Sequence, residues 1–155
     1  MSTPAGTTPA ATGHLDGLQS ALATQHAALY VVGALGAQTS ASATPDLFEL
    51  LVATYAEHRT RRDELSALVR AEGAEPVAAE TAYALPPDLT TPTAVTAAGL
   101  DVQRSCSAAW AYLVGTSPRA ERDYALQALK MTAVRELAFR GTPEMFPGTD
   151  EYADR

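Results

Sequence analysis

Apolar residues recur every three or four positions along four separate segments of the chain, which is the spacing of one face of an α-helix. The segments cover residues 13–37, 45–73, 92–115 and 118–141. Their apolar stripes are Leu15, Leu18, Leu22, Leu29, Val32 and Gly33; then Leu47, Leu50, Leu51, Thr54, Leu65, Leu68 and Val69; then Val95, Ala98, Val102, Cys106, Ala109, Trp110 and Leu113; and finally Leu126, Leu129, Ala133 and Leu137. The pattern therefore predicts an all-α protein.

Helix-start signals precede the last three segments. In each case a hydroxyl residue that can cap a helix stands before a proline, whose ring suits the first helical turn. The three pairs are Thr44-Pro45, Thr91-Pro92 and Ser117-Pro118. These signals support the boundaries that the periodicity indicates.

The connections decide how the helices are arranged. The first and last connections are short, so each should close an antiparallel helical hairpin. Residues 74–91 show no periodicity, and about 18 extended residues can reach roughly 60 Å, enough to run the length of a bundle. Two hairpins joined by a long crossover between helices two and three form a ferritin-like four-helix bundle. We expect that bundle over residues 14–148, with a disordered arm at 1–13 and a polar tail at 149–155.

Charge and cysteine content narrow the classes of function. Eleven basic and eighteen acidic residues give a net charge of −7, which disfavours nucleic acids and anionic membranes because both require neutralising cations. The single cysteine, Cys106, excludes an intrachain disulfide and a multi-cysteine zinc site. No membrane-spanning run or signal-peptide pattern is present. We expect a cytoplasmic protein that binds neither nucleic acid nor membrane.

Polar residues interrupt the inward stripes near the middle of three helices. A helical wheel brings seven of them to or beside the inward face: Gln25, His26, Glu57, His58, Arg61, Arg62 and Glu136. Ferritin-like dimetal proteins use a Glu from two helices and Glu-x-x-His from the other two. Here Thr60 stands three residues after Glu57, and Phe139 stands three residues after Glu136. The sequence therefore lacks a complete dimetal site.

Three interpretations of these polar residues remain. In the favoured one they form a charge-paired polar core network, in which Arg61 or Arg62 pairs with Glu57, Asp63 or Glu136, because buried charges persist when they are paired. As an alternative, a degenerate site binds iron or manganese for an oxidoreductase through His26, Glu57, His58 and Glu136. As a third, Arg61 and Arg62 hold a small anionic molecule. Elsewhere, His14 near the flexible arm is expected to be solvated, and Cys106 to be a core residue.

Four stretches of the chain carry a family resemblance. They are Gln25-His26-Ala27-Ala28-Leu29-Tyr30 with Gly33, then His58-Arg59-Thr60-Arg61-Arg62-Asp63-Glu64-Leu65, then Tyr83-Ala84-Leu85-Pro86, and Phe146-Pro147-Gly148. Together they resemble a family of small actinobacterial ferritin-like domains of unknown function. The resemblance implies a ferritin-like fold and no established reaction. It also implies that relatives often carry Glu where Gln25 and Asp101 stand, so two potential metal ligands are lost or shortened here.

The sequence as a whole favours a non-enzymatic structural or interaction protein without a cofactor. The expected partner is a protein, and a second copy of the chain is one candidate. The metal-dependent oxidoreductase and the binder of an anionic molecule are the alternative functions.

Overall fold

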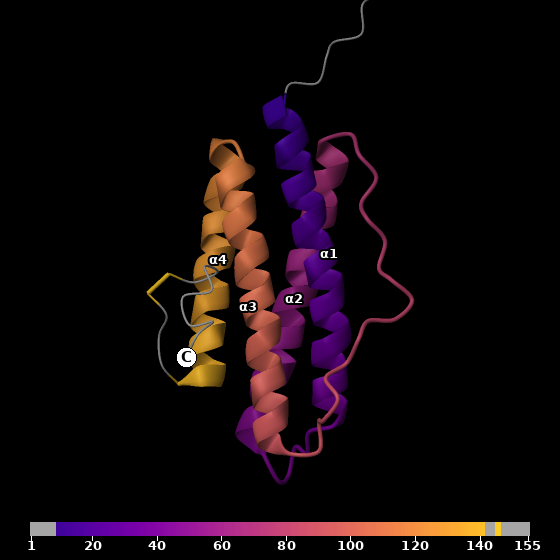
Figure 1. Cartoon of the computed structure of the whole chain (residues 1–155), viewed down its shortest axis with the longest axis vertical. Helices are drawn as coiled ribbons and strands as arrows, with labels where there is room; N and C mark the ends of the chain where they lie inside the picture. Colours follow the sequence, from indigo (N-terminus) through magenta and orange to yellow (C-terminus); the bar gives the residue numbers. More distant parts are fainter. Residues whose placement is uncertain (1–8, 142–144, 147–155) are drawn as a thin grey trace, which may run out of the picture.

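The computed structural model describes residues 9–141 and 145–146. It contains four helices, α1 (Pro9–Ala37), α2 (Pro45–Ala71), α3 (Pro92–Thr116) and α4 (Arg119–Arg140). The helices run side by side along the long axis of the molecule (Figure 1), and no strand occurs among the described residues. The prediction of an all-α four-helix bundle is confirmed.

The two hairpins and the crossover are visible in the chain path. Helices α1 and α2 form one hairpin and α3 and α4 the other, while α1 packs against α3 between the hairpins. The crossover between α2 and α3 runs the length of the bundle beside α1 (Figure 1). Gln19 on α1 receives a hydrogen bond from the Val77 backbone nitrogen at 2.8 Å and donates one to the Glu75 carbonyl at 2.7 Å. The Tyr30 and Tyr83 rings also contact each other, with centroids 5.5 Å apart, so the crossover is held to α1 at several points.

Helix boundaries follow the sequence signals in part. Thr91 caps α3 by accepting a hydrogen bond from the Ala94 backbone nitrogen. Thr44 does not cap α2, because its hydroxyl donates to the carbonyl of Ser40. Ser117 ends α3 and does not cap α4. Gly141 stops α4 in the left-handed region at φ 84°, a conformation that glycine adopts without steric cost.

The ends of the chain differ from expectation where they are described. Helix α1 begins at Pro9, so the segment 9–13 of the predicted disordered arm is helical. The rest of that arm and the predicted tail at 149–155 lie outside the described residues. Within the described part of the chain, no helix combines the length and the apolar character needed to cross a membrane.

The buried core has two apolar clusters. One cluster surrounds Trp110 and Leu18, where the start of α1 meets the end of α3. The other surrounds Leu35 and Phe139 toward the opposite end of the bundle. Buried polar side chains from all four helices lie between the clusters, so the apolar core is interrupted near mid-bundle.

Two glycines allow close helix packing. An added Cβ on Gly99 of α3 would lie 2.5 Å from the ring of Phe139 on α4. An added Cβ on Gly17 of α1 would lie 2.6 Å from the Thr116 hydroxyl on α3. Because such distances are far below normal carbon contacts, a side chain at either site would force its neighbour to move.

The predicted inward face of α4 is wrong. Leu126 and Leu137 were expected inside, yet each is 38% exposed. The buried residues of α4 are instead Ala125, Ala128, Thr132, Glu136 and Phe139. Small alanines and the seat of Phe139 on Gly99 let α4 approach α3 on this face. The helix is therefore rotated by about one residue, or roughly 100°. Leu126 and Leu137 face outward, while Leu129 is half-buried and still packs against the core.

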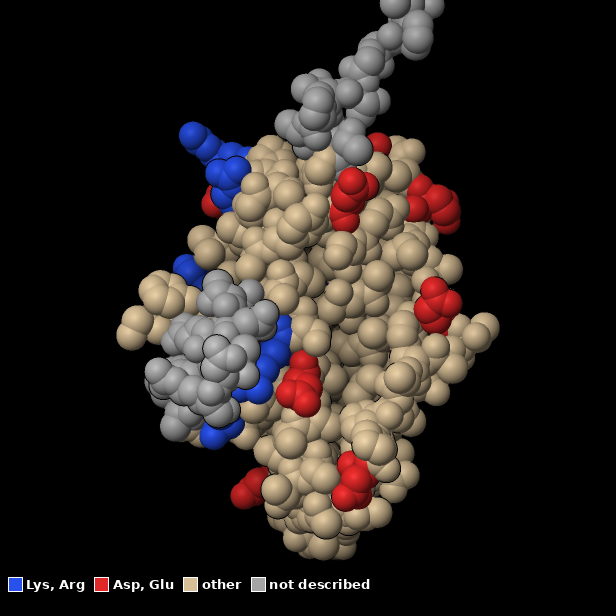
Figure 2. Space-filling model, in the orientation of Figure 1, with Lys and Arg blue, Asp and Glu red and all other residues tan. Residues whose placement is uncertain are grey.

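Charge is unevenly distributed on the surface. Helix α4 contains five of the eleven basic residues of a chain that is acidic overall. In the view of Figure 2, basic side chains gather on the side of the molecule that carries α4, and acidic side chains are scattered over the α1 side. The bundle thus has a more basic side despite its negative net charge.

Candidate functional site

A layer of buried polar side chains crosses the bundle at mid-height. Each helix supplies one member: Gln25 from α1, His58 from α2, Gln103 from α3 and Glu136 from α4. All four are at most 4% exposed. Because buried polar groups require hydrogen-bond partners, the partners of this layer determine what it can do.

His58 lies between two side-chain amides. Its Nδ1 is 2.8 Å from Oε1 of Gln25, and its Nε2 is 2.9 Å from Nε2 of Gln103. An amide nitrogen can only donate, so Nε2 of His58 accepts from Gln103, and Nδ1 carries the proton and donates to Gln25. This pattern selects one neutral tautomer of the imidazole.

Electrostatics favour the same neutral form. The pKa of His58 is lowered from its ordinary 6.5 to about 4, mainly by burial; the charge of Glu57 opposes the shift and that of Arg135 adds to it. A positive imidazole would lose its hydration and would also lose the hydrogen bond that Nε2 accepts. His58 is therefore uncharged at neutral pH and poorly suited to proton transfer there.

Glu136 is the only acidic side chain among the buried polar residues of the described chain. The hydroxyl of Ser107 on α3 donates a hydrogen bond to its Oε1. Nη1 of Arg140, one turn further along α4, lies 3.9 Å from its Oε2. A nearby positive charge and a hydrogen-bond donor are what a buried carboxylate requires, so the layer supplies its own countercharge.

Charged residues at the edge of the layer join α2 to α4. Nη2 of Arg135 lies 2.9 Å from Oε2 of Glu57, with both side chains about one-fifth exposed. Arg61 pairs with Glu64 at 2.9 Å and lies over the Tyr124 ring of α4. The sequence suggested that Arg61 or Arg62 would balance Glu57 or Glu136. The structure instead gives those roles to arginines of α4, because α2 directs Arg61 toward Glu64 on its own helix.

Arg62 and His26 lie away from the layer. Arg62 pairs with its neighbour Asp63 at 2.7 Å, which is one of the pairings expected from the sequence. His26 turns toward the crossover, where its Nε2 lies 3.1 Å from the carbonyl of Val77. Within the described residues, the ligand atoms of the alternative metal set, which combined His26 with Glu57, His58 and Glu136, do not converge.

Three residues of the layer and its edge were missed from the sequence: Gln103, Ser107 and Arg135. A signal for the first two exists, because Gln103, Cys106, Ser107 and Trp110 follow the i, i+3, i+4, i+7 spacing of one helix face. Because Gln103 and Ser107 are polar, they are not counted in an apolar stripe, although they lie on the same helix face. The position of Arg135 depends on the rotation of α4, for which its sequence carries no clear signal.

Cys106 is buried beside the layer. Burial raises the pKa of its thiol to about 12, and a hydrogen bond with Gln25 only partly offsets the rise. Since the thiolate is the reactive form of cysteine, Cys106 is a packing residue and not a nucleophile.

The comparisons with known proteins agree with this fold. The family described as Domain of unknown function (DUF4439) matches residues 17–151. The chain belongs to this family. The chain is also similar to the crystal structure of a conserved hypothetical protein, rv2844, from Mycobacterium tuberculosis. The two share 24% sequence identity and superimpose with a TM-score of 0.77, over 84% of this chain and 89% of that chain. At that identity the similarity shows a shared fold. No curated protein matches the chain.

Proposed function

We propose that this protein is a ferritin-like bundle in which a buried hydrogen-bonded layer replaces the metal centre, and that it acts as a non-enzymatic structural or interaction protein. One observation carries the proposal: both ring nitrogens of His58 are engaged by the amides of Gln25 and Gln103. A metal ligand needs a free nitrogen lone pair. His58 can offer one only by breaking a buried hydrogen bond.

The chemistry of the neighbouring residues supports the same conclusion. Dimetal bundles place carboxylates at mid-bundle, and these negative groups balance the charge of the metal ions. Gln25 and Gln103 are neutral amides, and Glu136 is already balanced by Ser107 and Arg140. The layer therefore has little negative charge left to attract a cation.

The outer face of α4 is the surface that best suits a partner. Four apolar side chains, defined here as the α4 outer face, are exposed along the helix: Leu126, Met131, Val134 and Leu137. Contiguous exposed apolar surface favours association. Asp123 and Lys130, two exposed charges beside it, have opposite signs. We therefore take a second copy of the chain as the first candidate partner.

A metal-loading experiment tests the non-enzymatic proposal. Purified wild-type protein and the His58→Ala variant are incubated anaerobically with Fe²⁺ or Mn²⁺, and bound metal is measured after desalting. We expect the two proteins to hold the same amount of metal, because His58 is not a ligand. Loss of bound iron or manganese in His58→Ala would contradict the proposal and favour the degenerate oxidoreductase.

Sedimentation equilibrium tests the α4 outer face. Wild-type protein should show a concentration-dependent dimer, and Val134→Glu should shift it to monomer by introducing a charge into the contact. Val52→Glu serves as the matched control because Val52 is a similarly exposed valine on α2, and it should leave the dimer unchanged. If wild-type protein stays monomeric over the whole concentration series, self-association through the α4 outer face is ruled out.

The anionic-ligand alternative has less support. Arg61 and Arg62 are engaged by Glu64 and Asp63, so an anion would have to displace existing carboxylates. Thermal stabilisation by a small anion, lost in Arg62→Ala, would be required to revive it.

A further inference from the structure

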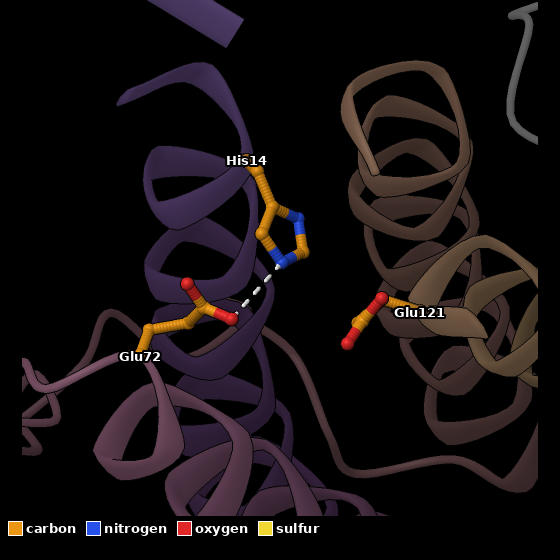
Figure 3. A group of neighbouring side chains, drawn as sticks. All are labelled: His14, Glu72 and Glu121. Atoms are coloured by element: carbon orange, nitrogen blue, oxygen red, sulfur yellow. Dashed lines mark ion pairs between the residues drawn. The ribbon is translucent and has the colours of Figure 1, made fainter. Parts of the chain in front are cut away.

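Three potential metal ligands meet at the end of the bundle where α1 begins. His14 comes from α1, Glu72 follows the last residue of α2, and Glu121 lies in the first turn of α4. One ligand atom from each lies within 4.8 Å of the other two. In Figure 3 the His14 ring points into the space between the two carboxylates. Three elements that are distant in sequence thus direct donor atoms to one point.

His14 is buried without a hydrogen-bond partner. It was expected to be solvated, but it is 5% exposed, partly because Gly17 lets this part of α1 lie close to α3. Neither ring nitrogen makes a hydrogen bond within the structure, and Nε2 lies 3.9 Å from Oε1 of Glu72, beyond hydrogen-bond range. Leaving a buried polar group without a hydrogen-bond partner is energetically unfavourable. The His14 imidazole therefore has unused hydrogen-bonding capacity that a bound group could satisfy.

In the described part of the chain, no Lys or Arg forms an ion pair with either carboxylate, that of Glu72 or that of Glu121. Arg122 lies nearby, but its guanidinium donates hydrogen bonds to the carbonyls of Val114 and Ser117 at the end of α3. The cluster thus combines two negative charges with one unsatisfied imidazole, and a cation would satisfy all three groups.

We propose that His14, Glu72 and Glu121 bind a divalent transition-metal ion that ties α1, α2 and α4 together at this end of the bundle. One imidazole with two carboxylates suits Zn²⁺ and its first-row neighbours, whereas Mg²⁺ and Ca²⁺ are usually held by oxygen ligands alone. Metal–ligand bonds of about 2.0–2.2 Å require the donors to draw together modestly. Glu72 is exposed and free to make this adjustment.

The surroundings provide access and room for further ligands. A pocket of about 550 Å³ is lined by His14 and Glu72 together with Ser117 and Arg122. The Ser117 hydroxyl in this pocket is buried and has no hydrogen-bond partner. Water that completes the coordination of the ion could bond to it. The site is separate from the mid-bundle layer, because none of its ligands contacts His58 or Glu136, and its role is structural.

Zinc titration tests the site. Protein freed of metal by chelation is titrated with Zn²⁺ in a calorimeter, and its thermal unfolding is followed with and without Zn²⁺. We expect one ion per chain and a rise in Tm, since a ligand that binds only the folded state stabilises it. His14→Gln and Glu121→Gln should each weaken binding by at least about tenfold, equivalent to 1.4 kcal/mol, and should lose the rise in Tm.

His26→Ala is the matched control. His26 is also a histidine of α1, but it bonds to the crossover, so its replacement should leave zinc affinity unchanged. Glu121 is only half-buried, and Glu121→Gln preserves the shape of its side chain, so this variant keeps the test valid if the His14 variant folds poorly. Zinc binding that is absent, not stoichiometric, or insensitive to Glu121→Gln would overturn the proposal. This outcome is independent of the mid-bundle layer. That layer is tested separately, by comparing the metal content of wild-type protein with that of the His58→Ala variant.

Discussion

Nδ1 of His58 lies 2.8 Å from Oε1 of Gln25, which joins α2 to α1 inside the bundle through one side-chain hydrogen bond. This hydrogen bond also determines the role of the other ring nitrogen, Nε2. Because Nδ1 donates, Nε2 must accept, and the amide of Gln103 on α3 supplies the donor. A chain of three uncharged side chains therefore connects three helices where a metal-binding bundle would place charged ligands.

Replacing His58 with Ala should lower the free energy of unfolding by about 2–4 kcal/mol, because it leaves a cavity and two buried amides without partners. Urea denaturation at neutral pH measures the change. The matched variant His26→Ala removes a partly exposed imidazole with one hydrogen bond to the crossover, and should cost less than about 1 kcal/mol. Equal losses in both variants would show that the buried layer adds no stability.

Stability should fall as the pH is lowered from about 6.5 to about 4. The pKa of folded His58 is about 4, against an ordinary value of 6.5, so the unfolded chain binds more protons in this interval and protonation favours unfolding. The neutral His58 imidazole contributes roughly 3 kcal/mol to the free energy of unfolding. This contribution is complete above pH 6.5 and is lost by about pH 4. Urea unfolding of wild type and His58→Gln across this range measures it as the difference between the two curves. Parallel curves would argue against a buried neutral His58.

Gly99→Ala should destabilise the protein by about 1–3 kcal/mol, because the new methyl group would meet the ring of Phe139. Gly115→Ala on the same helix is the control. Nothing lies within 4 Å of its added Cβ, so higher helix propensity should make it neutral or stabilising by up to about 1 kcal/mol. Thermal denaturation compares the two. Adding Phe139→Leu should recover part of the Gly99→Ala loss if the clash is its cause.

The Glu57–Arg135 ion pair should contribute measurably to the contact between α2 and α4. A double-mutant cycle with Glu57→Gln and Arg135→Met should give a coupling energy of about 1 kcal/mol that decreases with added salt. The Arg62–Asp63 pair is more exposed and lies within one helix, so its coupling should be near zero. Similar couplings for both pairs would mean that partial burial does not strengthen the Glu57–Arg135 bond.

Local features of the sequence account for most of the architecture. Helix periodicity is a short-range property, and Pro45, Pro92 and Gly141 mark helix ends through backbone sterics alone. The length of the segment 74–91 is enough for a crossover along the whole bundle. Gln25, His58 and Glu136 could be recognised as polar residues near inward faces because their neighbours follow the apolar spacing.

Contacts between helices establish which residues meet. The rotation of α4 depends on the packing of Phe139 against Gly99. This contact joins two helices, so it cannot be predicted from the apolar stripe of either helix alone. That rotation brings Arg135 to Glu57 and turns Leu126 and Leu137 outward. His14 is buried because α1 begins earlier than its apolar stripe and passes close to α3 at Gly17. The helices and their order can be predicted without any knowledge of contacts between helices, since they follow from local backbone conformation and periodicity. Only packing between helices could decide the hydrogen-bond and charge partners, because these depend on distances across the bundle.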